Sequence, residues 1–166
     1  MNKKTIKLLS LLSIGTIIAI GCADRRKAAS VYLRTTVPAE AKVLTCVADE
    51  SRFWCVLQLT PEQSVTFTET VKKSASWHPM PLTQELMDAA DYLQPHEREF
   101  RGQIPIANTN GYYTLLDLEA EYAAKHPDPA SLSRMKEPFQ KRGGLNYVFG
   151  YFDDIAGKVY VWWCHT

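Results

Sequence analysis

The sequence predicts one small α+β domain, with an antiparallel sheet of about five strands and two or three helices packed on one side. Three observations support this prediction. Of the 166 residues, the first 21 resemble a leader, and the rest suffice for one domain of ordinary size but not for two. Strand-like runs joined by short polar turns occur near both ends of that domain. Between them, two stretches have the apolar spacing of helices.

Residues 1–21 have the zones of a secretion signal. Lys3, Lys4 and Lys7 precede an apolar run of 13 residues, Leu8 to Ile20, whereas a helix that crosses a bilayer needs about 20. Basic residues ahead of a short apolar run are typical of a signal peptide, and the alternative is a buried helix of a soluble protein. We therefore expect residues 1–21 to be removed on export.

Residues 19–22, Ala-Ile-Gly-Cys, resemble the lipobox of bacterial lipoproteins. In that family the cysteine becomes the first mature residue and carries lipid on its sulfur and amine. Gly21 matches the family pattern, whereas Ala19 stands where leucine is usual. The resemblance implies that Cys22 is acylated and anchors the protein to a bacterial envelope membrane, facing the periplasm; Ala23 in place of Asp implies the outer membrane. The alternative is cleavage nearby, for example after Ala23, which would release a soluble protein.

We expect residues 22–40 to form the lipidated N-terminus and a tether, and residues 41–166 to form the domain. Arg25, Arg26 and Lys27 follow the cysteine closely, where they either meet anionic headgroups or belong to a solvated linker. Beyond the leader the chain has 16 basic and 18 acidic side chains, a net charge of −2. This balance gives no indication of nucleic-acid binding.

Export to an oxidising compartment makes the cysteines candidates for disulfide bonds. If Cys22 is acylated, Cys46, Cys55 and Cys164 remain, and one of the three must be left over. Catalysis by Cys164 is not expected, because the adjacent His165 would point to the other face of a strand. We predict a disulfide between Cys46 and Cys55.

This predicted disulfide depends on a β-hairpin. Any even-length loop centred on Glu50-Ser51 puts Cys46 opposite Cys55. With a two-residue loop they form a non-hydrogen-bonded pair, about 4.5 Å between Cα atoms, where a disulfide can close. An odd or bulged loop would misalign the sulfurs, leaving the cysteines packed as small hydrophobes or one of them bonded to Cys164.

Residue patterns in the middle of the chain predict a strand, a helix, a loop and a short second strand, in that order. Alternating apolar and polar residues predict a strand over 64–72, with a threonine-rich face open to solvent. Thr83 is expected to cap a helix over 84–93. The charged stretch 96–101 is typical of a surface loop, and residues 103–107 are expected to form a short strand.

The clearest helix signal begins at Thr114, and Asp117 completes a capping box there. Leu118 and Tyr122 lie on the expected apolar side of this helix, which should end before Pro127. Proline stops a helix because it lacks the backbone N–H and clashes with the preceding turn.

A shorter helix over 129–139 and a hairpin with strands over 145–152 and 158–164 complete the expected domain. If Tyr151 pairs with Val159, both faces of this hairpin are apolar. We therefore expect its strands to be central, with helices on one side of the sheet and another cover on the other side.

No motif with catalytic or metal-binding spacing occurs in the sequence. The four histidines are not spaced as metal ligands, and the GxGxxG, GxSxG and HExxH patterns are absent. We therefore expect no cofactor, no metal and no enzymatic activity. Active sites assembled from distant residues leave no local motif, so a small envelope hydrolase and a carrier of lipid or a small ligand remain the alternatives.

The preferred prediction is a protein-binding module in the periplasm, either an accessory of envelope assembly or an inhibitor or immunity protein against a toxin or hydrolase. The small size, the anchor, the possible disulfide and the lack of catalytic motifs motivate it. Aromatic side chains are favoured at the centres of protein interfaces. The candidate contact residues are therefore Tyr112, Tyr113, Tyr160 and Trp162, with packing in the core as the alternative.

Overall fold

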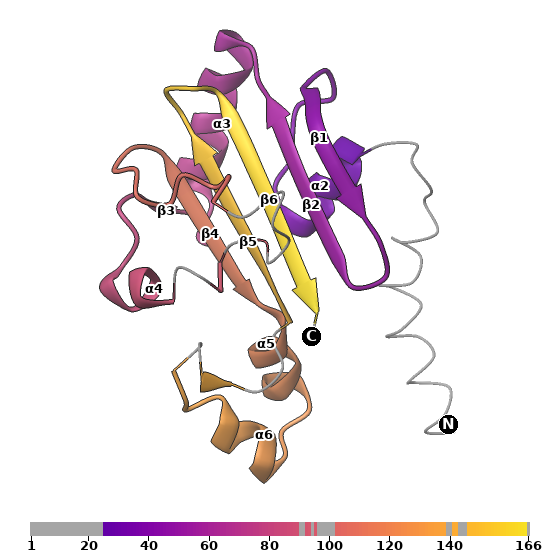
Figure 1. Ribbon diagram of the computed structural model, residues 1–166, viewed down its shortest axis with the longest axis vertical. Coiled ribbons are helices and arrows are strands. Elements are labelled where there is room, and N and C mark those ends of the chain that lie inside the picture. Colours follow the sequence, from indigo (N-terminus) through magenta and orange to yellow (C-terminus); the bar gives the residue numbers. More distant parts are fainter. Residues whose placement is uncertain are drawn as a thin grey trace.

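Six antiparallel strands form one sheet in the computed structural model, in the order β1-β2-β6-β5-β4-β3 (Figure 1). The predicted α+β class, a small domain with an antiparallel sheet, is confirmed, with one strand more than expected. The structure describes residues 25–89, 92–93, 95, 102–138, 141–142 and 146–165.

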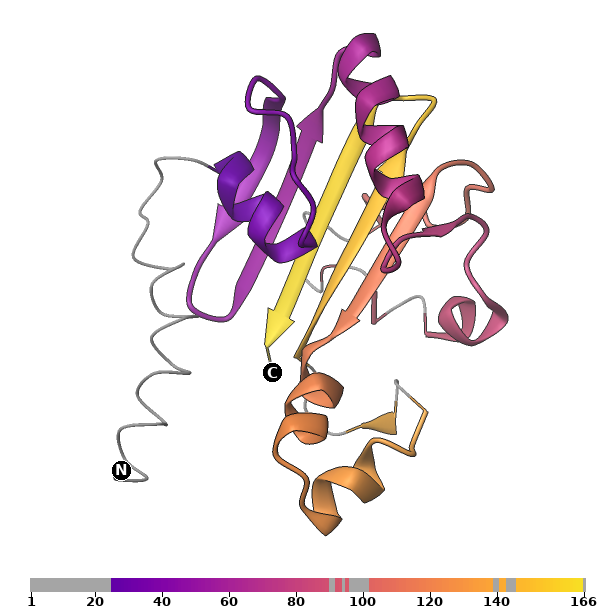
Figure 2. The same ribbon diagram turned by 180° about the vertical axis from the view of Figure 1, so that it is seen from behind.

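The helices and strands are arranged in layers around this sheet. The strands are β1 (Lys42–Ala48), β2 (Arg52–Gln58), β3 (His78–Pro79), β4 (Tyr112–Asp117), β5 (Asn146–Asp153) and β6 (Lys158–His165). The helices are α2 (Arg25–Leu33), α3 (Pro61–Lys73), α4 (Gln84–Asp88), α5 (Leu118–Lys125) and α6 (Pro129–Arg134). Helices α2 and α3 lie against one face of the sheet (Figure 2), and α5 and α6 project beyond one end of it.

Helix α2 belongs to the domain. Ala29 and Leu33, one helical turn apart, are completely buried against the sheet, and Tyr32 stacks on Phe53 of β2 with ring centroids 4.6 Å apart. The expected tether over residues 22–40 is therefore wrong for the part of it that the structure describes. This helix has only 9 residues, too short a window for its apolar period to stand out in the sequence.

Helix α3 overturns the predicted strand over 64–72. Thr60 Oγ1 accepts a hydrogen bond from Gln63 N, and Gln63 Oε1 accepts one from Thr60 N, which together make a capping box. Phe67 and Val71 are buried at helical spacing. The alternating threonines produce the strand-like pattern of this segment. In the helix, the hydroxyls of Thr66, Thr68 and Thr70 each donate a hydrogen bond to the backbone carbonyl oxygen four residues earlier.

The helix predicted from Thr114 is wrong at its start, because this segment is divided between β4 and α5. Strand β4 pairs with β5 along its whole length. Asp117, rather than Thr114, is the N-cap of α5, and its Oδ1 accepts a hydrogen bond from Ala120 N at 2.8 Å. Thr114 is completely buried opposite Gly150. Pairing with a central strand thus overrides the local capping signal.

Three other segments contain less regular structure than predicted. Thr83 caps α4 as expected, but this helix ends at Asp88. Helix α6 likewise ends at Arg134, and residues 103–107 form turns in place of a strand. The predicted loop over 96–101 lies outside the described residues.

The C-terminal hairpin has a register one residue away from the predicted one. Tyr151 pairs with Tyr160 and not with Val159. The turn has four residues, 154–157, and Asp153 Oδ1 accepts hydrogen bonds from two of their backbone N–H groups, at 2.8 and 3.1 Å. The turn ends on a glycine with a φ of +62°, a conformation that favours glycine.

Both faces of the central strands are covered, as predicted. One face packs against α2 and α3. The other face lies under the segment between β3 and β4 and is rich in aromatic side chains. We call it the aromatic face, and its aromatic members are Trp54, Tyr113, Tyr147, Phe149, Tyr151, Tyr160 and Trp162.

Candidate functional site

The structure places three of the four predicted contact residues inside the protein. Tyr113, Tyr160 and Trp162 are buried on the aromatic face, under the segment between β3 and β4. Tyr112 is half-buried on the opposite face, where its ring stacks with that of Phe152. A partner would not reach the first three residues without displacing that segment. These three side chains therefore pack in the core, which was the alternative interpretation of the sequence.

Three side chains of the aromatic face, Tyr147, Tyr151 and Trp162, make hydrogen bonds within the protein. Trp162 Nε1 donates a hydrogen bond to Tyr147 Oη at 3.0 Å, and the Tyr147 hydroxyl donates to the carbonyl oxygen of Tyr92. The Tyr151 hydroxyl donates to the carbonyl oxygen of Asn110 at 3.0 Å. Burial raises the pKa of Tyr151 to about 12 and also raises the pKa of Tyr147. Both hydroxyls keep their protons at neutral pH, so neither is suited to act as a general base.

Cys46 lies opposite Cys55 in the register of β1 and β2, as the hairpin predicts. The hydrogen bond from Asp49 N to Arg52 O, at 3.0 Å, closes the turn, and alternation from there makes Cys46 and Cys55 a non-hydrogen-bonded pair. In the reduced protein the Cys55 thiol donates a hydrogen bond to Cys46 Sγ, which lowers the pKa of Cys46. The two sulfurs are therefore neighbours, and the disulfide stays a prediction.

The sheet itself separates Cys164 from this pair. Cys55 belongs to the core with α2 and α3, whereas Cys164 lies on the aromatic face. A bond between Cys55 and Cys164 would have to pass through the sheet. The strand geometry therefore favours Cys46 as the partner of Cys55.

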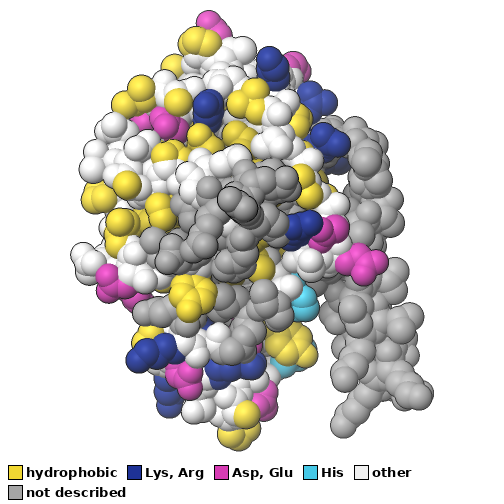
Figure 3. All heavy atoms as spheres, viewed as in Figure 1, with side chains coloured by type: hydrophobic (Ala, Val, Ile, Leu, Met, Phe, Trp, Pro, Cys, Tyr) yellow, Lys and Arg dark blue, Asp and Glu magenta, His cyan; other side chains and the backbone are white. Residues whose placement is uncertain are grey.

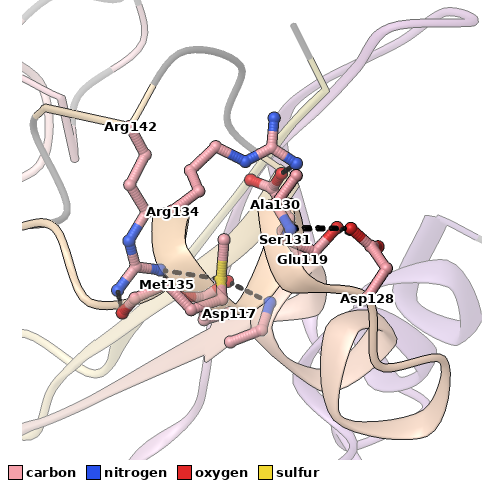
Figure 4. Close-up of polar contacts among 9 residues, drawn as sticks. Asp117, Glu119, Asp128, Ala130, Ser131, Arg134, Met135 and Arg142 are labelled. Carbon is pink, nitrogen blue, oxygen red and sulfur yellow. Dashed lines mark hydrogen bonds and ion pairs between the residues drawn. The ribbon is translucent and has the colours of Figure 1, made fainter.

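A group of polar contacts attaches α5 and α6 to the end of the sheet (Figure 4). Asp117 accepts a hydrogen bond from the Arg142 guanidinium, which also donates to the carbonyl oxygen of Met135 at 3.3 Å. Glu119 of α5 forms an ion pair with Arg134 of α6 at 2.5 Å. These charged contacts hold the two helices together. We refer to residues 118–134 as the α5–α6 unit.

Arg34 joins the α5–α6 unit to α2. Its guanidinium donates hydrogen bonds to both carboxylate oxygens of Glu121, at 2.7 and 2.8 Å. These bonds lower the pKa of Glu121. Arg34 has a φ of +51°, the left-handed conformation in which many helices end. The residue that terminates α2 therefore also orients α5.

The α5–α6 unit keeps large side chains on the outside. Tyr122 is 59% exposed and Leu132 is 44% exposed, and the Tyr122 ring packs on the His126 ring with centroids 4.7 Å apart. Ala123 is the only buried residue among the described residues of these two helices. We call Tyr122, His126 and Leu132 the α5–α6 surface.

This surface is not among the predicted contact residues. The sequence places Tyr122 on the apolar side of a longer helix, and so in the core. In the structure that helix begins only at Leu118 and lies beyond the end of the sheet (Figure 1), and Tyr122 is exposed. The exposure of Tyr122 follows from the point at which β4 ends, and the local signal there is Asp117, which caps α5 and precedes the acidic residues Glu119 and Glu121 of its first turn.

No protein-family model, curated protein or solved structure matches this chain. Within the residues that the structure describes, no helix has the length and apolar character needed to span a membrane. In the same residues, no three His, Cys, Asp or Glu side chains come together as metal ligands would.

Proposed function

We propose that this protein is a lipid-anchored protein of a bacterial envelope membrane that binds a protein partner in the periplasm through the α5–α6 surface. The observation that carries the binding is the exposure of Tyr122 and Leu132 on a unit held in place by ion pairs. Tyrosine is enriched among residues that dominate binding, and the Tyr122 ring is exposed while packed on His126. The anchor is supported by residues 1–22 alone, which have the pattern of a lipoprotein signal.

The shape of the α5–α6 unit suits a concave site on the partner. The unit projects beyond the end of the sheet (Figures 1 and 2). Its contact to Arg34 and the hydrogen bond from Arg142 to Asp117, the N-cap of α5, hold it in one arrangement before binding, which reduces the entropy lost on association. These features support an inhibitor or immunity protein that blocks the cleft of a toxin or hydrolase, or an accessory of an envelope assembly. Ala23 supports the outer membrane as its location.

Affinity capture from solubilised envelopes tests the binding. We expect the wild-type protein to recover one stoichiometric partner, and Tyr122→Ala to weaken that binding by about thirty-fold or more, as loss of a dominant interface residue does. Val65→Ala is the matched control, because Val65 is 67% exposed on α3 and lies outside the α5–α6 surface. Thermal unfolding should be the same for both variants, since both side chains are exposed.

Two outcomes would contradict the proposal. Recovery of no stoichiometric partner, together with turnover of an envelope substrate, would replace the binding role with that of a hydrolase. Equal capture by wild type, Tyr122→Ala and Leu132→Ser would exclude the α5–α6 surface. Mass spectrometry of the mature N-terminus tests the anchor separately, because acyl groups on Cys22 support it and an unmodified Cys22 contradicts it.

A further inference from the structure

The two sulfurs of the Cys46–Cys55 pair differ in their access to solvent. Cys46 lies on the edge strand β1 and is half-buried, whereas Cys55 lies on β2 and is completely buried. Both side chains lie on the face of the sheet that α2 covers, because Cys55 belongs to that core and Cys46 packs against it. A reagent in solution therefore reaches one sulfur of the pair and not the other.

The positions of the two strands also decide which sulfur can be attacked. A thiolate attacks a disulfide sulfur in line with the bond that breaks, so the target sulfur must be open on the side away from its partner. On that side Cys46 faces the outer edge of β1, which pairs with no other strand among the described residues. On the corresponding side Cys55 faces Val161 of β6, which is completely buried. Exchange is therefore open at Cys46 and blocked at Cys55.

The surroundings of Cys46 favour its thiolate, which is the form that attacks a disulfide. The hydrogen bond from Cys55 and the positive charge of Arg25, the first residue of α2, both lower the pKa of Cys46. The same hydrogen bond and burial raise the pKa of Cys55, which therefore keeps its proton. Lys and Arg side chains gather at the upper right of Figure 3, on the side where β1 lies in Figure 1. Cys46 thus has the setting of an attacking thiol and Cys55 that of a second thiol held in reserve.

We propose that the folded protein exchanges thiol and disulfide with an external disulfide at Cys46, and that Cys55 is the resolving thiol. The Cys46 thiolate attacks one sulfur of the external disulfide and forms a mixed disulfide with that half, while the other half leaves as a thiolate and takes up a proton. The Cys55 thiol then loses its proton and attacks Cys46 Sγ from the inner side. This step forms the Cys46–Cys55 bond and releases the second half as a thiol. The protein loses two electrons and two protons, and the external disulfide gains them.

The inference goes beyond the proposed binding role. It needs the proposed periplasmic location only as the source of the external disulfide, either a small molecule or the active-site disulfide of a thiol oxidoreductase. It needs neither the lipid anchor nor the α5–α6 surface. The pair then stays in exchange with its surroundings after folding, whereas a disulfide enclosed on both sides would close once and remain inert.

Alkylation of the reduced wild-type protein tests the order of reactivity without any substitution. The purified protein is treated under native conditions with a substoichiometric amount of iodoacetamide, and peptide mass spectrometry locates the modified cysteine. We expect Cys46 to react about a hundredfold faster than Cys55, because only local opening exposes the buried thiol. Cys164, buried on the aromatic face, should be as slow as Cys55. In urea the three rates should become similar.

Oxidised glutathione tests the two steps in the native protein. Cys55→Ser should accumulate glutathione on Cys46, because no thiol resolves the mixed disulfide. The matched variant Cys46→Ser should form a mixed disulfide about a hundredfold more slowly, because Cys55 is buried. The wild type should end as the Cys46–Cys55 disulfide and retain no glutathione. Both variants should react alike in urea, which controls for the reagent.

A second oxidant identifies the source of the external disulfide. An oxidised oxidoreductase with a Cys-x-x-Cys active site replaces glutathione at the same concentration. A faster reaction with this protein assigns an oxidoreductase as the partner, and a faster reaction with glutathione assigns a small disulfide. In both assays the reaction should require Cys46.

Three results would overturn the proposal. In the native wild type, first modification of Cys55 or Cys164 would assign the wrong entry point. Equal rates for folded Cys46→Ser and Cys55→Ser would remove the distinction between the two sulfurs, and thiols that resist both oxidants until the protein unfolds would show an inert pair. The other proposals fail separately: glutathione on Cys22 of the mature protein would contradict the anchor, and unweakened capture by Tyr122→Ala would contradict the α5–α6 surface, with the result at Cys46 unchanged.

Discussion

Gly150 of β5 lies directly beneath Leu33 of α2. A Cβ atom on Gly150 would come within 2.4 Å of Leu33 Cδ2, so the helix packs on the backbone of a central strand. Just after the helix, Thr35 Oγ1 accepts a hydrogen bond from Trp77 Nε1 at 2.9 Å in the buried interior. Helix α2 therefore closes one side of the core, and a lipid on Cys22 would be attached to the folded domain itself.

Gly150→Ala should lower the free energy of unfolding by about 1–3 kcal/mol, because the added methyl group overpacks the contact with α2. Leu33→Ala should lower it by about 2–5 kcal/mol, because it leaves a cavity. In the double variant the cavity accommodates the methyl group, so the loss should be smaller than the sum of the two. Urea unfolding of all three proteins measures this coupling, and strict additivity would contradict the contact.

Thr60→Ala removes the capping box of α3 and should lower the free energy of unfolding by about 1 kcal/mol. Thr66→Ala, on the exposed side of the same helix, is the control. Alanine favours a helix more than threonine does, so this variant should be unchanged or more stable by a few tenths of a kcal/mol. If residues 64–72 formed a strand instead, Thr66→Ala would lower the free energy of unfolding, because threonine favours a strand more than alanine does. Denaturant unfolding of both variants makes the comparison.

We expect the exported protein to contain a disulfide between Cys46 and Cys55. Closing a loop of about ten residues should stabilise the fold by about 2.5–3 kcal/mol in the chain-entropy model. A reducing agent should therefore destabilise the wild type and Cys164→Ser alike, and leave the stability of Cys46→Ser unchanged. Maleimide labelling of the unfolded, non-reduced protein should modify Cys164 alone. Labelling of all three thiols would contradict the disulfide.

The ion pair between Arg34 and Glu121 should make a small, pH-dependent contribution to stability. The hydrogen bonds from Arg34 hold the pKa of Glu121 below its ordinary value of 4.5. The contribution is therefore fully present above that ordinary value and is lost as the pH falls through the lowered pKa.

Arg34→Gln should accordingly lower the free energy of unfolding by less than about 1 kcal/mol at neutral pH, because the pair is partly exposed to water. In strongly acidic solution the variant and the wild type should be equally stable. Urea unfolding at the two pH values checks this, and an equal difference at both would show that the ion pair is not the cause.

The register of the first hairpin was easier to predict than that of the C-terminal hairpin, which differs by one residue, or than the identity of the third element. The turn centred on Glu50-Ser51 places Cys46 opposite Cys55 because register propagates directly from a turn along both strands. The alternation over 64–72 favoured a strand, although threonine hydroxyls also bond within a helix. The decisive capping box starts at Thr60, ahead of that window.

The residues of the candidate site could not be predicted from the sequence, because their exposure depends on contacts between segments far apart in the chain. Tyr113, Tyr160 and Tyr122 are the same residue type, but the first two are buried under the segment between β3 and β4 and the third is exposed. Burial depends on which distant segment covers a side chain. The exposed tyrosine therefore became identifiable only once the ends of β4 and α5 were known.

By itself the sequence determined the signal-like leader, Cys22 at its end, the Cys46–Cys55 register and a C-terminal hairpin apolar on both faces, because each depends on residues close together in the chain. Only the tertiary structure decided that α2 belongs to the core and that Tyr122 is exposed. Those outcomes depend on packing between segments far apart in the sequence. Such packing outweighs the small differences in local helix and strand propensity.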